Sequence, residues 1–319
     1  MTTYNFIDIP NSTATKFHLT SCNEMLVFNM LKLQNAIVAL YRKAATSLPE
    51  DVETALRLAC RKEEKGSNAR AALSTILENI EIARAGERPI CQDTGVPVFF
   101  VKSPAGLSHL KLKDVIIKAT RIATREIPLR PNAVDMLTDK NSGDNTGIGF
   151  PVIYIEETKD KKLTVDLMLK GSGSENIGQL YKLPIADLKA ERDIEGIRKC
   201  VLDTVYKAQG KGCPPYIIGI GIGATKDQVT RLAKEQLMRN LDDINKQKVL
   251  AQLEKRLLND INKLGIGPLG FGGKTTALGV KIGANHRHPA SYFVDVSVSC
   301  WADRRARLIW KIQNEKYKI

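Results

Sequence analysis

Three cysteines stand where predicted helices and strands end, and their thiols could hold a metal. Cys91 follows a helical pattern in PICQDTG, Cys213 precedes an apolar run in GKGCPPYIIG, and Cys300 ends one in VSVSCWADRR. Functional residues gather at such junctions, and cysteine thiolates are ligands of zinc and of iron–sulfur clusters. Their positions leave two interpretations open: three metal ligands, or half-buried cysteines in ordinary turns.

The other three cysteines are predicted to have no part in this chemistry. Cys60 in LRLACRKE and Cys200 in GIRKCVLD fall within helical patterns and are interpreted as packing residues, and Cys22 lies near an irregular terminus. No C-x-x-C pair occurs among the six cysteines, so zinc-ribbon and ferredoxin spacings are absent. In a reducing cytosol thiols or metal ligands are expected rather than disulfides.

Two glycine-rich segments are similar to nucleotide-binding loops. GIGIGATKDQ, beginning at Gly219, fits G-x-G-x-x-[GA] with Ala224 in the last position, but no acidic residue about 20 residues on completes the βαβ unit. GFGGKTT, residues 270–276, ends like a P-loop, but Pro268 occupies the place of the first glycine. Both patterns favour a close approach of the backbone to a neighbouring segment over a phosphate site.

Composition narrows the function classes. The 319 residues are 43% hydrophobic, enough for a large core. Lys and Arg exceed Asp and Glu by 48 to 35, a net charge of +13 that suits anionic partners. The basic residues are scattered, which disfavours nucleic-acid binding. No signal-peptide pattern occurs at the start and no apolar run approaches the roughly 18 residues of a membrane span. We therefore expect a cytoplasmic protein without a membrane or nucleic-acid partner.

The elements that must position these residues follow from the hydrophobic pattern. It predicts a mixed α/β fold, in which a helical N-terminal layer is followed by β-sheets packed with helices in a single large domain. Residues 1–22 are predicted to be irregular and residues 23–319 to form the domain. PVIYIEE and KLTVDLML are predicted as a β-hairpin, GSGSEN as a loop, and the terminal WADRRARLIWKIQ as a helix.

Eight motifs in order carry a resemblance to a known family. They are CQDTG, LRPNAVD, NTGIG, KGSGSEN, CPPYIIGIGIGAT, LGIGPLGFGGKTTALGVKI, HRHPAS and SCWADRRA. Together they resemble the iron–sulfur class I fumarases and their tartrate dehydratase relatives. More narrowly, they are similar to the separate α subunit, which corresponds to the N-terminal domain of the single-chain enzymes.

The resemblance implies a 4Fe–4S cluster held by three thiolates, at Cys91, Cys213 and Cys300. The fourth iron would lack a protein ligand, and an open metal position acts as a Lewis acid. The resemblance also implies substrate-binding and catalytic residues at matching positions. The substrate-binding residues would be Gln92, Asp93, Arg130 and Gly173, and the catalytic residues His288 and Asp93.

The resemblance further implies a partner. Single-chain members carry a C-terminal domain with more cationic substrate contacts and the proton-abstracting residue. This sequence ends at Ile319, so we expect a separate β subunit to complete the site, in an α2β2 assembly acting on a C4 dicarboxylate. KGSGSEN and GGKTTAL are more similar to the fumarase branch, which favours hydration of fumarate to malate. Dehydration of tartrate to oxaloacetate is the alternative, and a nucleotide-binding protein a more distant one.

Overall fold

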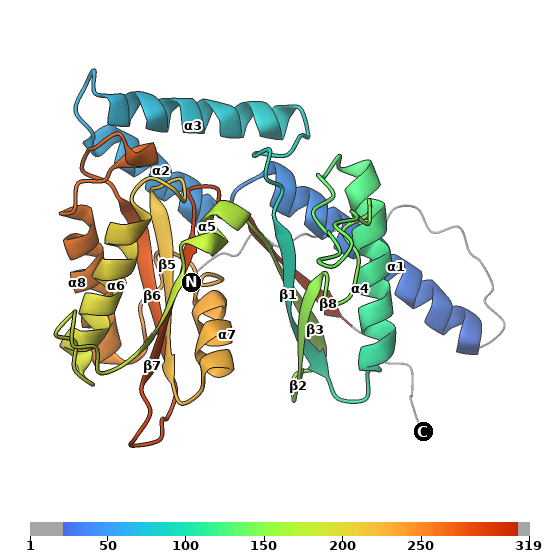
Figure 1. The fold of residues 1–319 in the computed structure, drawn as a ribbon. Coiled ribbons are helices and arrows are strands. Elements are labelled where there is room, and N and C mark those ends of the chain that lie inside the picture. Colours follow the sequence, from blue (N-terminus) through green and yellow to red (C-terminus); the bar gives the residue numbers. More distant parts are fainter. Residues whose placement is uncertain (1–21, 312–319) are drawn as a thin grey trace. The chain divides into compact units, whose positions relative to one another are not determined.

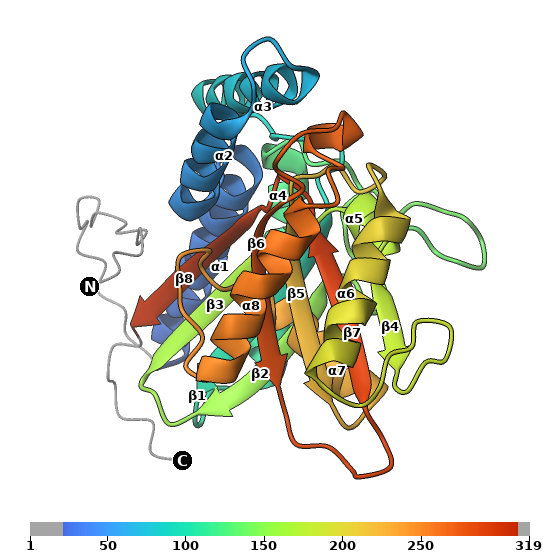
Figure 2. The same ribbon diagram turned by 90° about the vertical axis from the view of Figure 1, so that its left-hand side faces the viewer.

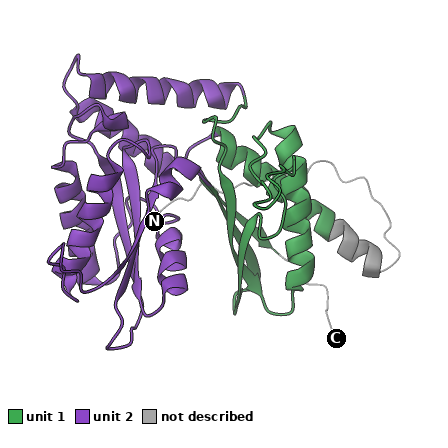
Figure 3. Ribbon diagram, in the orientation of Figure 1, with its two compact units in different colours: residues 1–46, 87–169, 305–319 green, residues 47–86, 170–304 purple. Residues whose placement is uncertain are grey.

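A computed structural model describes the backbone of residues 22–311 and the side chains of residues 30–311. The segment 1–21, predicted to be irregular, lies outside these residues. The chain divides into two compact units that alternate along the sequence (Figure 3). Unit 1 comprises residues 1–46, 87–169 and 305–319, and unit 2 comprises residues 47–86 and 170–304. The mixed α/β class is confirmed; the extent of the predicted domain, 23–319, stays a prediction.

Unit 1 is a four-stranded sheet with helices α1 (Cys22–Thr46) and α4 (His109–Glu126) packed on it (Figure 1). The strand order is β2-β1-β3-β8, with β1 parallel to β2 and β3 antiparallel to β8. The bounds are β1 (Val96–Pro104), β2 (Val152–Thr158), β3 (Lys162–Lys170) and β8 (Arg305–Lys311). Alternate residues of β3, such as Leu163 and Val165, join the apolar core beneath the helices.

Two sequence predictions in unit 1 are wrong. β2 and β3 are consecutive but not paired, because β1 lies between them. A short connection suffices to pass over one strand, since neighbouring strands lie only about 4.8 Å apart. The segment after Cys300 is not helical: residues 305–311 form β8, which pairs with β3. Arg307 lies opposite Asp166 and forms an ion pair of 2.6 Å, so cross-strand contacts override the helical pattern.

Unit 2 is built on a second four-stranded sheet of order β4-β7-β5-β6 (Figure 2). The strands are β4 (Gln179–Lys182), β5 (Tyr216–Gly223), β6 (Ala277–Ala284) and β7 (Phe293–Ser299). Helices α6 (Ile194–Ala208) and α8 (Lys248–Asn262) cover one face and share its apolar core. Helix α7 (Lys226–Gln236) packs on β5 from the other side. The short strand β4 has no counterpart in the sequence predictions.

The predicted N-terminal helices form, and they are divided between the two units. Helix α1 belongs to unit 1, whereas α2 (Glu50–Lys62) and α3 (Asn68–Ala85) belong to unit 2. Acidic residues open α2 and basic residues close it, an arrangement that favours the helix dipole. The Ser67 hydroxyl caps α3 by accepting from the Arg70 amide over 3.2 Å. Within the described part of the chain, no helix has the length and apolarity to cross a membrane.

The GIGIG segment is explained by packing on the two faces of β5. Ile218 and Ile220 point into the core shared with α6 and α8. A Cβ at Gly219 would lie 2.2 Å from the Ala233 carbonyl oxygen, and one at Gly221 would lie 2.1 Å from the Val229 carbonyl oxygen. Only glycine therefore lets α7 approach the strand so closely. The predicted close approach is confirmed, within the strand rather than in a turn.

The GFGGKTT segment also contacts its own unit. The Lys274 amide, which would face a phosphate in a P-loop, donates to both carboxylate oxygens of Glu63, over 3.0 and 2.9 Å. Glu63 is buried at the end of α2. The loop thus binds an anionic group supplied by the protein itself, which favours the packing interpretation of this motif.

Candidate active site

Two of the three predicted ligands, Cys213 and Cys300, lie together where the central strands of the unit 2 sheet begin and end. Cys213 shortly precedes β5, and Cys300 directly follows β7. Because β5 and β7 are antiparallel neighbours with Ile217 opposite Ser299, the start of β5 and the end of β7 lie side by side, and the two cysteines meet there. The Trp301 amide donates to the Cys213 carbonyl oxygen over 3.2 Å and joins the two turns. Cys213 and Cys300 are called the cysteine pair below.

The turn that carries Cys213 has an uncommon backbone conformation. Cys213 is exposed, and its φ of +58° lies in the left-handed region that non-glycine residues seldom occupy. The Tyr216 hydroxyl fixes the turn: it donates to the Gln209 carbonyl oxygen over 2.6 Å and accepts from the Gly212 amide over 3.2 Å. Cys213 is one of seven described non-glycine residues with a positive φ, so it is the fixed turn, together with the thiol, that marks this position.

Two buried cations lie beside Cys300. Lys170 and Arg304 are each only 2% exposed. Burial raises the pKa of the Cys300 thiol to about 11, whereas Arg304, the Ala302 amide and Lys170 act to lower this pKa. Positive charge shielded from water attracts anions strongly. The two cations therefore favour an anionic group at this end of the sheet, and they offset part of the cost of burying charge at Cys300.

Lys170 belongs to a polar cluster with residues of α5 (Ser172–Asn176) and α7. Its ammonium group donates to Ser174 Oγ over 2.8 Å and lies 3.3 Å from Glu175 Oε2. Glu175 also pairs with Lys234, at 2.5 Å. Burial lowers the pKa of Lys170. Burial alone would raise the pKa of Glu175, but the two lysines hold this pKa below its usual value. The two lysines and Glu175 thus form a connected set of ion pairs.

Gly173 lies close to the Cys213 turn. It stands on α5, so the predicted GSGSEN loop is in fact a short helix. A Cβ at Gly173 would lie 3.8 Å from the Lys211 carbonyl oxygen, which places α5 against the turn leading to Cys213. Unit 2 thus brings Gly173 and the cysteine pair to one end of its sheet, and the predicted role of Gly173 in substrate binding stays a prediction.

The CQDTG turn and Arg130 lie together in unit 1. Cys91 and Asp93 are partly exposed and Gln92 is exposed, directly ahead of β1. The Gly95 amide donates to Asp93 Oδ1 over 3.0 Å, which closes the turn. The Thr94 hydroxyl donates to the Arg130 carbonyl oxygen over 3.3 Å. The structure therefore places three predicted substrate-binding residues, Gln92, Asp93 and Arg130, on adjoining segments.

The Arg130 side chain makes no contact that would occupy its charged group within the described part of the chain. Its side chain is exposed, and among the described residues its guanidinium group has no hydrogen-bond or ion-pair partner, whereas its carbonyl oxygen is well bonded. The segment is thus fixed through the backbone while the charged group remains available. A guanidinium group offers two parallel donors to a carboxylate.

His288 lies at the other end of the unit 2 sheet from the cysteine pair. It stands in the exposed loop between β6 and β7, where its Nδ1 accepts from the Ala290 amide over 3.0 Å. The seven residues of β7 separate this loop from Cys300, about 24 Å of extended chain. The structure does not bring His288 to the cysteine pair within unit 2, and its catalytic role stays a prediction.

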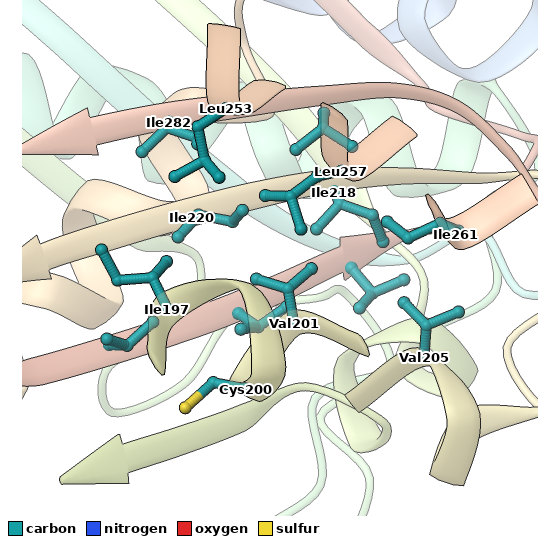
Figure 4. Packing of buried hydrophobic residues seen from close by; sticks show 14 of the residues in the cluster. Ile197, Cys200, Val201, Val205, Ile218, Ile220, Leu253, Leu257, Ile261 and Ile282 are labelled. Atoms are coloured by element: carbon teal, nitrogen blue, oxygen red, sulfur yellow. The ribbon is translucent and has the colours of Figure 1, made fainter. Parts of the chain in front are cut away.

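The helical cysteines lie apart from this site. Cys200 is fully buried on α6, and Figure 4 shows it beside Ile197 and Val201 in the apolar core. Burial raises the pKa of its thiol to about 12. Cys60 stands on α2, with its sulfur 3.5 Å from Ser74 Oγ on α3. Cys200 is therefore a packing residue, as predicted, whereas Cys60 is partly exposed between two helices and its role stays a prediction.

The donor set can be compared with the needs of an iron–sulfur cluster. In the described residues, no group of three or more His, Cys, Asp and Glu side chains is close enough to hold a metal ion. The structure does place two thiols together on unit 2 and a third on the turn of unit 1 that carries Gln92 and Asp93. Thiols at element ends beside buried cations fit an anionic, thiolate-bound group. A sequence profile described as fumarate hydratase (Fumerase) matches residues 34–309.

The chain belongs to the fumarate hydratase family. It is 48% identical over 279 residues to a candidate class I fumarate hydratase of Geobacillus stearothermophilus, covering 86% of this chain but only 54% of that protein. A candidate L(+)-tartrate dehydratase subunit alpha of Methanocaldococcus jannaschii is 43% identical, over 86% of this chain and 96% of its own length. The L(+)-tartrate dehydratase subunit alpha of Escherichia coli K12 is 31% identical, over 87% of this chain and 90% of its own length. These relatives are named after reactions that add or remove water.

The sequence patterns do not single out the cations beside Cys300, Lys170 and Arg304, or the partners of Lys170. One signal was present: a lysine ends the apolar run of β3 directly before GSGSEN. A lysine that continues a buried strand must find polar partners, and its partners are contributed by α5.

Asn145 holds the segment that carries Arg130, so replacing it tests how strongly the fold fixes this part of the candidate site. It is 1% exposed, accepts from the Asn132 amide over 2.6 Å and donates to the Arg130 carbonyl oxygen over 3.0 Å. Its φ is +58°. Asn145→Ala should lower the free energy of unfolding by about 2–4 kcal/mol, because two polar groups lose their partners and alanine disfavours that backbone conformation. Urea denaturation measures the change.

Two matched variants separate the causes. Asn145→Gly relieves the backbone conformation but not the lost hydrogen bonds, so it should recover part of the stability. Asn141→Ala removes an exposed asparagine from the same loop, where Nδ2 donates to the Pro131 carbonyl oxygen over 3.0 Å, and should cost less than about 1 kcal/mol. Equal stability of Asn145→Ala and the wild type would show that Asn145 does not hold the segment.

Proposed function

We propose that this chain is the α subunit of a two-subunit 4Fe–4S hydro-lyase that hydrates fumarate reversibly to malate. The observation that supports it most is the cysteine pair with two buried cations at its side. Cys91, Cys213 and Cys300 would hold the cluster. When bound, the cluster would supply an iron with an open position, a Lewis acid that polarises a hydroxyl group or water.

The chain's own residues would bind and orient the dicarboxylate. Arg130 would clamp one carboxylate through two parallel hydrogen bonds. Gln92 and Asp93 follow Cys91 directly and would position the reacting end of the substrate. The Gly173 backbone N–H would donate to a carboxylate oxygen, and Lys170 and Arg304 would keep the site cationic. A base for the carbon-bound proton is expected on the partner, with His288 as a further candidate on this chain.

The tartrate dehydratase reaction is the second candidate. The M. jannaschii and E. coli relatives carry that name and match this chain over nearly their whole length. Both reactions remove water from a C4 hydroxy-dicarboxylate, so the same Lewis acid and the same arginine serve either. The motif KGSGSEN favours fumarate.

Activity should depend on a separate β subunit. This chain matches only 54% of the Geobacillus protein. The β subunit to use is the separate chain, from the same organism as this one, that is similar to the rest of the Geobacillus protein. The α chain purified anaerobically and reconstituted with iron and sulfide should be brown but should dehydrate malate at under about 1% of the rate of the two subunits together, because acid and base must act in concert. Absorbance at 240 nm follows fumarate formation.

The same comparison with tartrate as substrate, followed through the formation of oxaloacetate, decides between the substrates. A higher kcat/KM for tartrate than for malate would replace the fumarate assignment. A colourless protein that takes up no iron would refute the cluster, and malate dehydration by the lone chain at the full rate would refute the need for a partner.

A further inference from the structure

An apolar loop on unit 1 displays side chains that a soluble surface rarely exposes. Residues 131–149, here called the docking loop, join α4 to β2 (Figure 1). Met136, Leu137 and Ile148 are 93%, 92% and 106% exposed, the three highest values among the large apolar side chains that the structure describes. Val134 in the same loop is 49% exposed. Single exposed apolar residues are common, and what distinguishes these four is that one loop of the chain carries them all.

The docking loop is held rigidly by its own polar groups. Asp135 Oδ1 accepts from the amides of Leu137 and Thr138, over 3.1 and 2.8 Å. The Asp135 amide donates to the Lys140 carbonyl oxygen over 2.9 Å, and the Ser142 amide to the Ala133 carbonyl oxygen over 2.8 Å. The apolar side chains are thus presented on an ordered frame. A surface ordered before binding loses less conformational entropy when a partner docks.

The base of the loop is connected to the candidate active site. Asn132 Nδ2 donates to the Gly95 carbonyl oxygen over 3.2 Å and lies 3.4 Å from Thr94 Oγ1. Asn145, at the other end of the loop, bonds the Arg130 carbonyl oxygen. The same residues therefore hold the docking loop, Arg130 and the CQDTG turn. A protein seated on the loop would lie next to the substrate-binding groups of unit 1.

We propose that the docking loop is the surface on which the β subunit binds; this rests on the function proposed above. A subunit that completes the active site must reach the substrate bound by Arg130, and the docking loop is the apolar surface adjoining it. The loop carries three aspartates against one lysine. The matching β surface is therefore an apolar recess for Met136, Leu137 and Ile148 with basic residues at its rim.

The test is a double variant, Met136→Asp with Leu137→Asp, in the full α chain. Both side chains point into solvent, so folding should be unchanged, which circular dichroism and the melting temperature check. Binding to the purified β subunit, measured by isothermal titration calorimetry, should weaken by about 30-fold or more, the effect of losing a central apolar anchor. Ile148→Asp should weaken it in the same direction.

Leu110→Asp and Ile244→Asp provide matched controls, since these side chains are 80% and 82% exposed but lie outside the loop. They should change the dissociation constant less than about threefold. A photo-reactive amino acid at position 136 of the otherwise unchanged chain should crosslink to the β subunit, a readout that does not depend on the folding of the aspartate variants.

Three outcomes would overturn the proposal. If β binds the wild type and the double variant equally, the loop is not the docking surface although the two-subunit function stands. If β binds neither, both proposals fail. If the double variant instead dissolves a homodimer of the α chain, or position 136 crosslinks to a second α chain, the loop is an interface between copies of this chain.

Discussion

Replacing Cys213 or Cys300 with serine should abolish iron binding and reduce the activity of the two-subunit enzyme by more than about a thousandfold. A Lewis-acidic metal supplies several kcal/mol of transition-state stabilisation, and about 4 kcal/mol corresponds to a thousandfold in rate. Serine is close to cysteine in size but is a poor ligand for iron in clusters. Cys91→Ser should have the same effect. Iron and sulfide analysis after anaerobic reconstitution, together with malate turnover, measures both losses.

Cys60→Ser and Cys200→Ser are the matched controls. Cys60 lies between α2 and α3, and Cys200 lies in the core of unit 2. Cys200→Ser buries a hydroxyl group and should lower stability, yet it should keep its iron. Full iron loading in Cys213→Ser with loss in Cys200→Ser would overturn the assignment of the ligands.

Arg130→Lys should lower kcat/KM by about 30- to 1000-fold without changing the iron content. The variant keeps the positive charge but loses the planar pair of donors, and truncating one partner of a bound charge pair costs about 2–4 kcal/mol. Stability should be unchanged, because the backbone carbonyl of Arg130 and not its guanidinium group bonds Thr94 and Asn145. Steady-state kinetics on malate and thermal unfolding test the two halves of this expectation.

Arg125→Lys, an exposed change in the last turn of α4, is its control and should leave kcat/KM within about twofold. A folded Arg130→Lys variant with full activity would remove Arg130 from the substrate site. A variant that unfolds would instead assign it a structural role.

Local sequence patterns determined most of the elements and the chemistry of the candidate ligands. The N-terminal helices α1, α2 and α3, helix α6 around Cys200, and strands β2, β3, β5 and β7 form where the patterns predict them. The placement of Cys91, Cys213 and Cys300 at element ends, and of Cys60 and Cys200 within helices, follows from the same patterns. These features depend on residues a few positions apart, so the hydrophobic period carries them.

Pairing between distant segments was decided only by the tertiary structure. The segment 305–311 reads as a helix by itself but becomes β8 because β3 offers it a partner strand, with Asp166 opposite Arg307. The insertion of β1 between β2 and β3 has the same origin. Strand pairing depends on hydrogen bonds and packing between residues far apart in sequence, and neither leaves a local periodic signal.

The candidate site divides in the same way. The sequence by itself determined which residue types could bind iron and a dicarboxylate. The antiparallel register of β5 and β7 decided that Cys213 and Cys300 are neighbours and that His288 lies at the opposite end of the strands. Lys170 and Arg304 became part of the site only through burial beside Cys300. Charge in a sequence is fixed by residue type, but its strength in a site depends on which groups the fold removes from water.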